Sequence, residues 1–250
     1  MEVMNMKVLA FNASPLMENG NTAIMLEPFL KGMKEEGCDI ELFYTSKLQV
    51  KPCLGDRACW TKTPGKCVQD DDVKMLIPKI QQADFIVFAT PVYVDGMPGA
   101  LKNLIDRLLP VIEPYFVLQA KHCRHPPRQP HKSSRVALVA NCGFWEKDNF
   151  DPLIIHMKAI CKNTSWEYTG ALLRPHAEAL SYMVRKGIPV QDVLDAAENL
   201  GRELVKTGRM SKKNLKIVNR ELVSLETYVE MTNKGFKQTL DRLTKTENPP

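Results

Sequence analysis

The chain has 250 residues, of which 44% are hydrophobic, and its formal net charge is +5. This length and apolar content suffice for a sizeable buried core, so the composition excludes a low-complexity or disordered protein. The 34 basic residues are spread among 29 acidic ones, which argues against nucleic-acid binding.

Membrane insertion and export are also not expected. No stretch approaches the roughly 20 apolar residues that cross a bilayer, and Met1 to Lys7 lacks the features of an export signal. The seven cysteines are an odd number in a chain too large to depend on disulfides, so they are interpreted as thiols or ligands. We therefore expect a cytoplasmic protein with no membrane segment.

The first half of the chain alternates apolar runs with helical patterns. Gly37 ends the first helix, Asp71 and Asp72 can cap the second, and Pro98 can occupy the first turn of the third. A cysteine-containing insertion from Lys51 to Cys67 interrupts this alternation. The expected strands are Lys7–Asn12, Asp39–Tyr44 and Phe85–Thr90, and the expected helices are Thr22–Glu36, 71–82 and Pro98–Leu109.

The second half continues the alternation after a loop rich in Pro, His and Arg at Lys121–Lys132. Strands are expected at Arg135–Asn141 and Glu167–Leu173, and helices at Pro152–Cys161 and Val190–Lys206. Such alternation predicts an α/β fold with a doubly wound five-stranded parallel sheet of order 2-1-3-4-5. Residues 1–209 would form this domain, and residues 210–250 a helical C-terminal extension with a frayed, Pro-ended tail.

The loop after the first expected strand is rich in small hydroxyl and amide side chains. It runs from Asn12 to Thr22 and opens the first helix, where backbone N–H groups attract phosphate. Ser14 and Thr22 are expected to donate to that phosphate, with Asn21 as a further donor. Dinucleotide and triphosphate fingerprints are both missing, so a monophosphate such as that of FMN fits better. The alternative is a turn and helix cap with no ligand.

A second motif, at the end of the third expected strand, carries a family resemblance. It reads Thr90-Pro91-Val92-Tyr93 and continues through Met97-Pro98-Gly99 to Leu101-Lys102. Together with Asn12-Ala13-Ser14-Pro15 and Gly20-Asn21-Thr22, it resembles the NAD(P)H-dependent FMN reductases and iron–sulfur flavoproteins, which are flavodoxin-like. The resemblance continues through Asn141 to about Leu180.

The resemblance implies an FMN site built from three loops. The phosphate would be surrounded by Ser14, Asn19, Asn21, Thr22 and Ala23; the flavin ring would be lined by Pro91, Val92, Tyr93 and Gly96; and the fourth strand would contribute Asn141, Cys142 and Gly143. Backbone amides in such turns can hydrogen-bond the flavin while Tyr93 packs on its plane. The alternative for Tyr93 is an ordinary packing residue. Phe144 and Trp145 could flank the flavin or anchor a subunit interface.

The insertion contains Cys53, Cys59 and Cys67. It is similar to the cluster-binding region of iron–sulfur flavoproteins, but Asp56 stands where those have a further cysteine. Since a four-iron cluster takes four thiolates, we expect no complete cluster. A cluster held by Asp56 or by three cysteines, a zinc site completed by a distant histidine, and a redox-active disulfide are the alternatives.

The loop at Lys121–Lys132 contains His122, Cys123, His125 and His131, in a spacing that matches no zinc pattern. A solvated loop is expected there, with contact to a dinucleotide phosphate or to another subunit as alternatives.

The function expected from this resemblance is an NAD(P)H-dependent oxidoreductase of the flavin reductase type. Hydride would pass from the nicotinamide to FMN, and electrons then to an unnamed small-molecule or protein acceptor. No acid–base residue is obligatory, because the cofactor supplies the chemistry. The resemblance implies a homo-oligomer, either dimer or tetramer. The alternatives are an electron carrier reduced by a protein donor and a flavin-free binding module.

Overall fold

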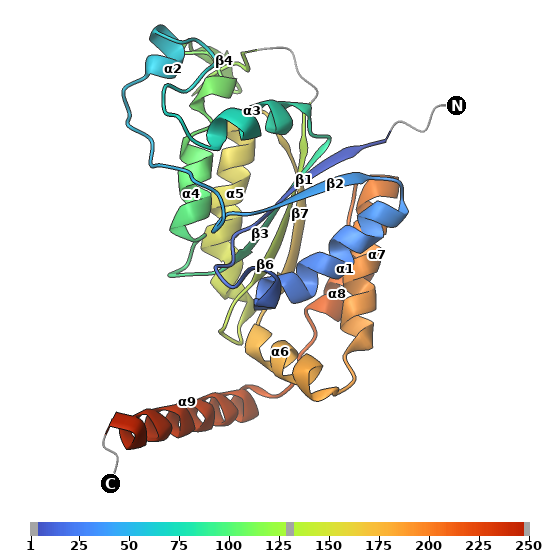
Figure 1. Ribbon diagram of the computed structural model, residues 1–250. Helices are drawn as coiled ribbons and strands as arrows, with labels where there is room; N and C mark the ends of the chain where they lie inside the picture. Colours follow the sequence, from blue (N-terminus) through green and yellow to red (C-terminus); the bar gives the residue numbers. More distant parts are fainter. Residues whose placement is uncertain (1–4, 129–132, 248–250) are drawn as a thin grey trace.

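A five-stranded parallel sheet with helices on both faces forms the centre of the molecule (Figure 1). The computed structural model describes residues 5–128 and 133–247. The start of the chain, the end of the basic loop with His131, and the last three residues lie outside this range. The sheet order is β2-β1-β3-β6-β7. The strands are β1 (Lys7–Asn12), β2 (Asp39–Tyr44), β3 (Phe85–Pro91), β6 (Arg135–Asn141) and β7 (Glu167–Arg174).

This order is the predicted one, because β4 and β5 belong to a separate hairpin. The fold class is therefore confirmed. Among the described residues, no helix combines the length and the hydropathy needed to cross a bilayer.

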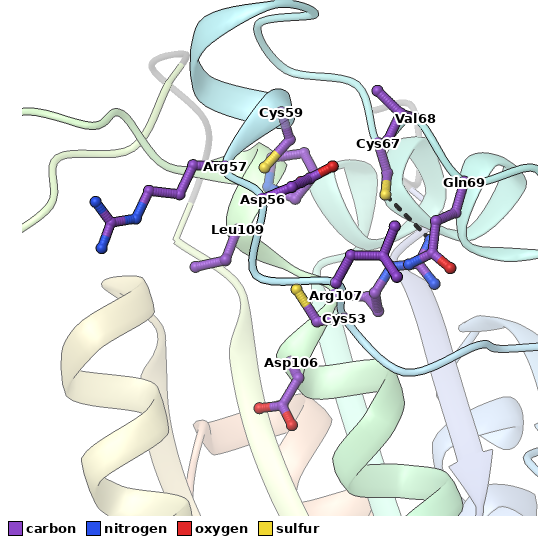
Figure 2. Close-up of a pocket in the computed structure, with 12 residues that line it drawn as sticks. Cys53, Asp56, Arg57, Cys59, Cys67, Val68, Gln69, Asp106, Arg107 and Leu109 are labelled. Atoms are coloured by element: carbon purple, nitrogen blue, oxygen red, sulfur yellow. Dashed lines mark hydrogen bonds between the residues drawn. The ribbon is translucent and has the colours of Figure 1, made fainter.

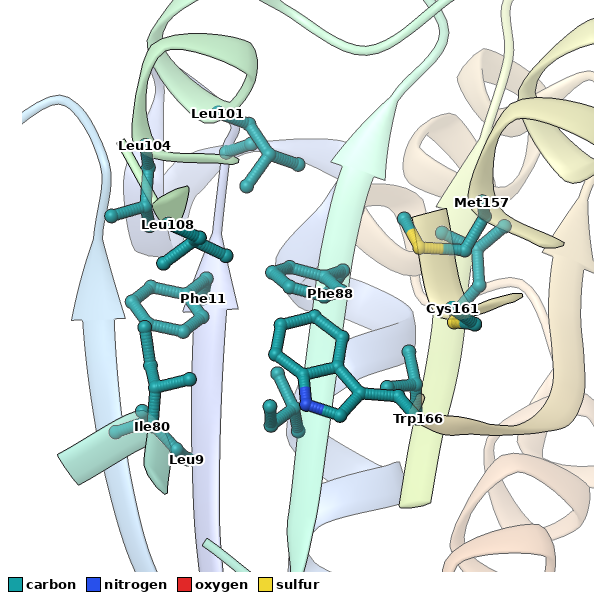
Figure 3. Packing of buried hydrophobic residues seen from close by; sticks show 14 of the residues in the cluster. Leu9, Phe11, Ile80, Phe88, Leu101, Leu104, Leu108, Met157, Cys161 and Trp166 are labelled. Carbon is teal, nitrogen blue, oxygen red and sulfur yellow. The ribbon is translucent and has the colours of Figure 1, made fainter. Parts of the chain in front are cut away.

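Strand alternation divides the core into two layers. In β1, Leu9 and Phe11 face one cluster while Val8 and Ala10 face the other, as the two-residue period of a strand requires. The first cluster lies under α3 (Val73–Gln82), α4 (Gly99–Asp106) and α5 (Asp151–Thr164). There, the rings of Phe11 and Phe88 stack at 5.8 Å (Figure 3).

The second cluster is covered by α1 (Asn21–Glu35), α6 (Ala177–Lys186) and α7 (Gln191–Thr207). Two glycines allow α1 and α7 to approach closely. A Cβ at Gly32 would collide with the backbone of Glu198, and one at Gly201 with the carbonyl oxygen of Phe29. Helix α6 was not expected from the sequence.

The helices at residues 71–82 and 98–109 are shorter than expected. Asp72 is the N-cap residue of α3 but makes no side-chain cap, since its carboxylate accepts from the Gln49 amide; Asp71 Oδ1 accepts from the Val73 amide at 3.2 Å. Pro98 precedes α4 rather than lying in its first turn. α4 ends at Asp106, and a 3₁₀ turn, η2 (Leu109–Val111), follows.

The basic loop is partly regular, contrary to the prediction. β4 (Val117–Gln119) and β5 (His122–Arg124) form an antiparallel hairpin through Ala120 and Lys121, which both have positive φ. This turn conformation is usual in hairpins, but it normally carries Asn or Gly. The usual sequence signal for a hairpin is therefore missing here.

The short helix α2 (Ala58–Thr61) lies in the cysteine insertion, and Trp60 Nε1 donates to the Leu109 carbonyl at 2.9 Å. A 3₁₀ turn, η1 (Met17–Asn19), lies in the loop after β1, and another, η3 (Lys147–Phe150), precedes α5.

The C-terminal region is helical, as predicted, and consists of α8 (Lys212–Val218) and α9 (Leu225–Glu247). α8 packs against α7, and Val218 is fully buried. Figure 1 shows α9 extending away from the sheet.

Candidate functional site

The loop after β1 forms a compact turn beneath the start of α1. Asn12 Oδ1 accepts from the Ser14 amide at 2.9 Å, and Ser14 Oγ accepts from the Leu16 amide at 3.3 Å. Gly20 leaves room for this serine, because a Cβ there would collide with Ser14 Oγ. The Ser14 hydroxyl hydrogen thus remains available to a ligand. Asn21 and Thr22 begin α1, where amides have no intrahelical acceptor.

The Thr22 hydroxyl has a different partner from the one expected. It donates to Asn141 Oδ1 at 2.6 Å, in a buried contact that joins α1 to the end of β6. This bond orients the Asn141 side chain. No local pattern could have revealed it, because the two residues are far apart in the chain. Only the backbone N–H of Thr22 then suits the expected phosphate contact.

The chain after β3 makes a tight hairpin at the mouth of a cleft. Tyr93 and Gly96 exchange two backbone hydrogen bonds of 2.9 and 3.1 Å, and the intervening Val94 and Asp95 both have positive φ. Such a conformation is strained for a β-branched residue and often marks a ligand-binding site. The Val94 side chain is 99% exposed and that of Tyr93 49% exposed.

The chain after β6 forms the opposite side of the cleft. Burial raises the pKa of the Cys142 thiol to about 11, so this sulfur stays protonated at neutral pH. It donates to the Phe144 carbonyl at 3.3 Å. The Gly143 carbonyl accepts from the Tyr228 hydroxyl at 2.5 Å, and burial raises the pKa of that phenol to about 12.

These three loops line one cleft of about 1000 Å³. Two expected residues are not part of its lining: Ala23 is buried below the loop, and Gly96 holds the hairpin through its backbone. The other ten all line it: Ser14, Asn19, Asn21, Thr22, Pro91, Val92, Tyr93, Asn141, Cys142 and Gly143.

One wall of this cleft was not expected from the sequence, and it comes from α9. Leu225, Val229, Thr232 and Phe236 line it together with Tyr228. Their spacing of three or four residues is the signal that could have revealed an apolar helix face. It was overlooked because the extension is rich in charged residues. Glu178 and Arg185 of α6 are further lining residues that were not expected.

A buried Arg174–His176 pair anchors the chain that leads to α9. Arg174 donates to the carbonyls of Val218 at 2.6 Å and Arg220 at 3.0 Å. His176 Nε2 accepts from the Leu222 amide at 3.2 Å. Burial, with the nearby Arg174 charge, lowers the pKa of His176 to about 4, so the ring is neutral at pH 7.

Phe144 and Trp145 have different environments. Phe144 is 68% exposed at the cleft, whereas Trp145 Nε1 donates to the Val223 carbonyl at 3.1 Å and its ring stacks on His176. Trp145 thus holds the C-terminal segment of its own chain.

The cysteine insertion shares no residue with the lining of this cleft. It lies beside Leu109 of η2 (Figure 2). Cys53, Asp56, Cys59 and Cys67 line a space of about 20 Å³, which is about the room that one water molecule needs. Asp56 Oδ1 accepts from the Ala58 amide at 3.1 Å. Three thiols and one carboxylate do not make up the four thiolates that a four-iron cluster takes.

Arg107 occupies the position next to Cys67. It is buried and forms a bidentate pair with Asp71, with distances of 2.7 and 3.1 Å, while its Nη2 lies 3.1 Å from Cys67 Sγ. Burial of Asp71 alone would raise the pKa of its carboxyl, but the hydrogen bonds and charge of Arg107, together with hydrogen bonds from the backbone amides of Lys51 and Val73, outweigh this and the net pKa is lowered. A buried guanidinium thus shares its donors between this carboxylate and the cysteine.

His125 of the basic loop packs on Trp60, with ring centroids 4.9 Å apart, and its Nδ1 lies 2.7 Å from the Glu113 carbonyl oxygen. Within residues 5–128 and 133–247, no three His, Cys, Asp or Glu side chains gather closely enough to hold a metal ion. The described part of the loop therefore packs against the insertion.

The comparison with known protein families points to the same family as the two loop motifs. Residues 6–123 match the sequence model of the NADPH-dependent FMN reductases. Over this segment the chain is similar to that family. The match ends before β6, so it covers less of the chain than the resemblance implied.

Curated relatives match less than half of the chain. An iron–sulfur flavoprotein of Archaeoglobus fulgidus is 39% identical over 41% of this chain and 48% of its own length. Another, from Methanocaldococcus jannaschii, is 37% identical over 42% of this chain and 53% of its own. The chain thus spans about half the length of these relatives.

Solved structures are similar to this chain in fold over more of its length than the curated relatives cover. An FMN-dependent NADH-azoreductase from Bacillus anthracis superposes with a TM-score of 0.57 at 16% identity, over 79% of this chain and all of its own. A flavone reductase gives 0.55 at 20% identity, over 81% of this chain and 64% of its own. The fold is flavodoxin-like.

Proposed function

We propose that this protein binds FMN in the cleft and uses it as an NAD(P)H-dependent oxidoreductase. The observation that carries the proposal is the meeting of two family motifs, at Asn12–Thr22 and Thr90–Lys102, at the carboxyl ends of β1 and β3. The helices that follow β1 and β3, α1 and α4, lie on opposite faces of the sheet. Doubly wound sheets bind ligands at such a point. The family match over residues 6–123 supports the same cofactor.

The cleft fits FMN in size and in its donors. Its volume of about 1000 Å³ is at the upper end of ordinary ligand sites, which span about 300–1,000 Å³. The start of α1 offers backbone N–H groups and the Ser14 hydroxyl to the phosphate. In this assignment the turns at Pro91–Tyr93 and Asn141–Gly143 would hold the flavin ring.

FMN, when bound, supplies the two-electron carrier that accepts hydride from the nicotinamide. The chain's own residues bind and orient the reactants. Asn141, held by Thr22, presents its amide at the end of β6, and the Cys142 thiol stays protonated because burial raises its pKa to about 11. No residue of this site is assigned an acid–base role.

Several features of the proposal rest on the family resemblance. We assign residues 1–209 to the FMN domain and residues 210–250 to the extension, place the protein in the cytoplasm, and expect a dimer or tetramer. The electron acceptor is a small molecule or a protein.

An anaerobic absorption spectrum of FMN-loaded protein, recorded before and after NADH or NADPH, tests the function. The visible absorption band of the flavin should bleach within the mixing time of a stoichiometric addition. Protein that takes up no FMN would contradict the assignment of the cleft. Bound flavin that only a reduced protein donor can bleach would instead identify an electron carrier.

A further inference from the structure

Helix α9 carries an apolar stripe that extends beyond the body of the protein. Val229, Phe236 and Leu240 lie on this stripe, and the side chains of the last two are 68% and 63% exposed. The spacing of three or four residues continues from Leu225 through Thr232 to Leu243. Isolated exposed apolar residues are common, but a continuous stripe on one helix face marks an interaction surface.

The residues of the stripe are spaced nearly symmetrically along the helix about Lys234. Thr232 and Phe236 lie at equal distances on either side of Lys234, as do Leu225 and Leu243. Val229 lies five residues before Lys234 and Leu240 six residues after it. Two antiparallel copies of α9 that cross at Lys234 would therefore bring apolar side chains into register along the whole stripe. Such a contact is isologous, because each helix presents the same surface to the other.

The charged residues of α9 also favour antiparallel pairing. Between Leu225 and Asn233 the only charged residues are Glu226 and Glu230, and between Lys234 and Leu240 they are Lys234 and Lys237. Parallel pairing would place like charges together. An antiparallel pair that crosses at Lys234 brings Glu230 to within one residue of the level of Lys237 of the partner subunit, and both lie on the same flank of the stripe at 100° per residue.

We propose that α9 pairs antiparallel with α9 of a second copy of this chain, and that the pair completes the cleft. The part of the stripe from Leu225 to Phe236 lines the cleft. The second half of the partner's helix, with Phe236 and Leu240 of the partner subunit, then lies across its open side. This specifies the surface of the homo-oligomer that the proposed function leaves open.

Analytical ultracentrifugation of the full chain over a concentration series tests the pairing. Leu240→Glu introduces a charge into the stripe and should raise the dimer dissociation constant about 100-fold or more. Gln238→Glu adds the same charge to the opposite face of α9 and should change it less than about threefold. Because both sites are exposed, circular dichroism should show that both variants fold. A wild-type chain that is monomeric throughout, or a Leu240→Glu chain that dimerises normally, overturns the proposal.

Charge reversal tests which residues meet. Glu230→Lys and Lys237→Glu should each weaken the dimer about tenfold, and the double variant should return to within about threefold of wild type. Additive weakening in the double variant would show that these residues do not meet across the pair.

Disulfide trapping tests the orientation. Under mild oxidation, a Val229→Cys/Leu240→Cys chain should form a covalent dimer, whereas either single variant should not exceed the background of the native thiols. Cross-linking of the single Leu240→Cys variant would indicate parallel helices and overturn the proposal. These measurements do not depend on flavin. A failed NAD(P)H assay would therefore reject the proposed function and leave the pairing intact.

Discussion

At the scale of single residues, Ser14 is the side chain best placed to bind a phosphate. Its hydroxyl oxygen accepts from the Leu16 amide, which leaves the hydroxyl hydrogen for a ligand. Ser14→Ala should weaken FMN binding by about 1–3 kcal/mol, the usual contribution of a hydrogen bond to a charged group. Fluorescence titration of the apoprotein measures this, with the exposed Ser133→Ala as the matched control. Equal affinities for the two variants would contradict the phosphate placement.

His176 should make stability depend on pH. Its pKa is about 4 in the folded chain, against 6.5 for an unperturbed histidine, because burial and Arg174 disfavour its charged form. Between these values only the unfolded chain binds a proton at this ring. Stability should therefore fall as the pH drops from 6.5 to 4, by roughly 3 kcal/mol from this group.

Urea unfolding of the wild type and of His176→Asn at several pH values isolates this contribution. At pH 7 the wild type should be the more stable protein, because the shorter asparagine side chain cannot replace the ring contacts. The difference in free energy of unfolding should narrow toward pH 4, and a difference that stays constant would show that His176 is not held neutral by the fold.

At the scale of elements, the contact between α1 and α7 depends on glycine. Gly→Ala within a helix normally adds up to about 1 kcal/mol of stability. At Gly201 the added Cβ would collide with the Phe29 carbonyl oxygen, so Gly201→Ala should instead destabilise the protein by about 1–3 kcal/mol.

Gly99, in the first turn of α4, is the matched control, since a Cβ there meets nothing within 4 Å. Gly99→Ala should leave the melting temperature unchanged or slightly raised. If Gly201→Ala does the same, the two helices are more loosely packed than described.

At the scale of the whole molecule, the cysteine insertion decides whether flavin is the sole redox centre. The chain has Cys53, Cys59 and Cys67, with Asp56 in the position of the missing thiolate. Carboxylate is a harder ligand than thiolate and holds iron of a cluster less well. Anaerobic reconstitution with iron and sulfide should therefore leave fewer than about four of each per chain.

The complementary variant is Asp56→Cys, which restores the family's ligand set. It should acquire the iron, the sulfide and a charge-transfer band that the parent lacks. A full four-iron cluster in the parent would overturn the prediction and add a second electron carrier beside the flavin.

Much of the fold and part of the site could be predicted from the sequence. The strand order follows from five apolar runs, their turn residues and the right-handed crossover, all of which are local or nearly local properties. Ten of the twelve expected residues line one cleft for the same reason, since motifs at the ends of β1, β3 and β6 necessarily share one edge of a parallel sheet.

Other features depended on the tertiary structure. Thr22 was expected to donate to phosphate, but its hydroxyl donates to Asn141. The hairpin of β4 and β5 forms without a Gly or Asn turn signal. The Arg174–His176 pair draws the C-terminal segment to the end of β7, where α9 adds a wall to the cleft. Apolar periodicity defines which face of an element is buried, but the partner of a polar side chain distant in sequence depends on how the packed elements bring the two groups together.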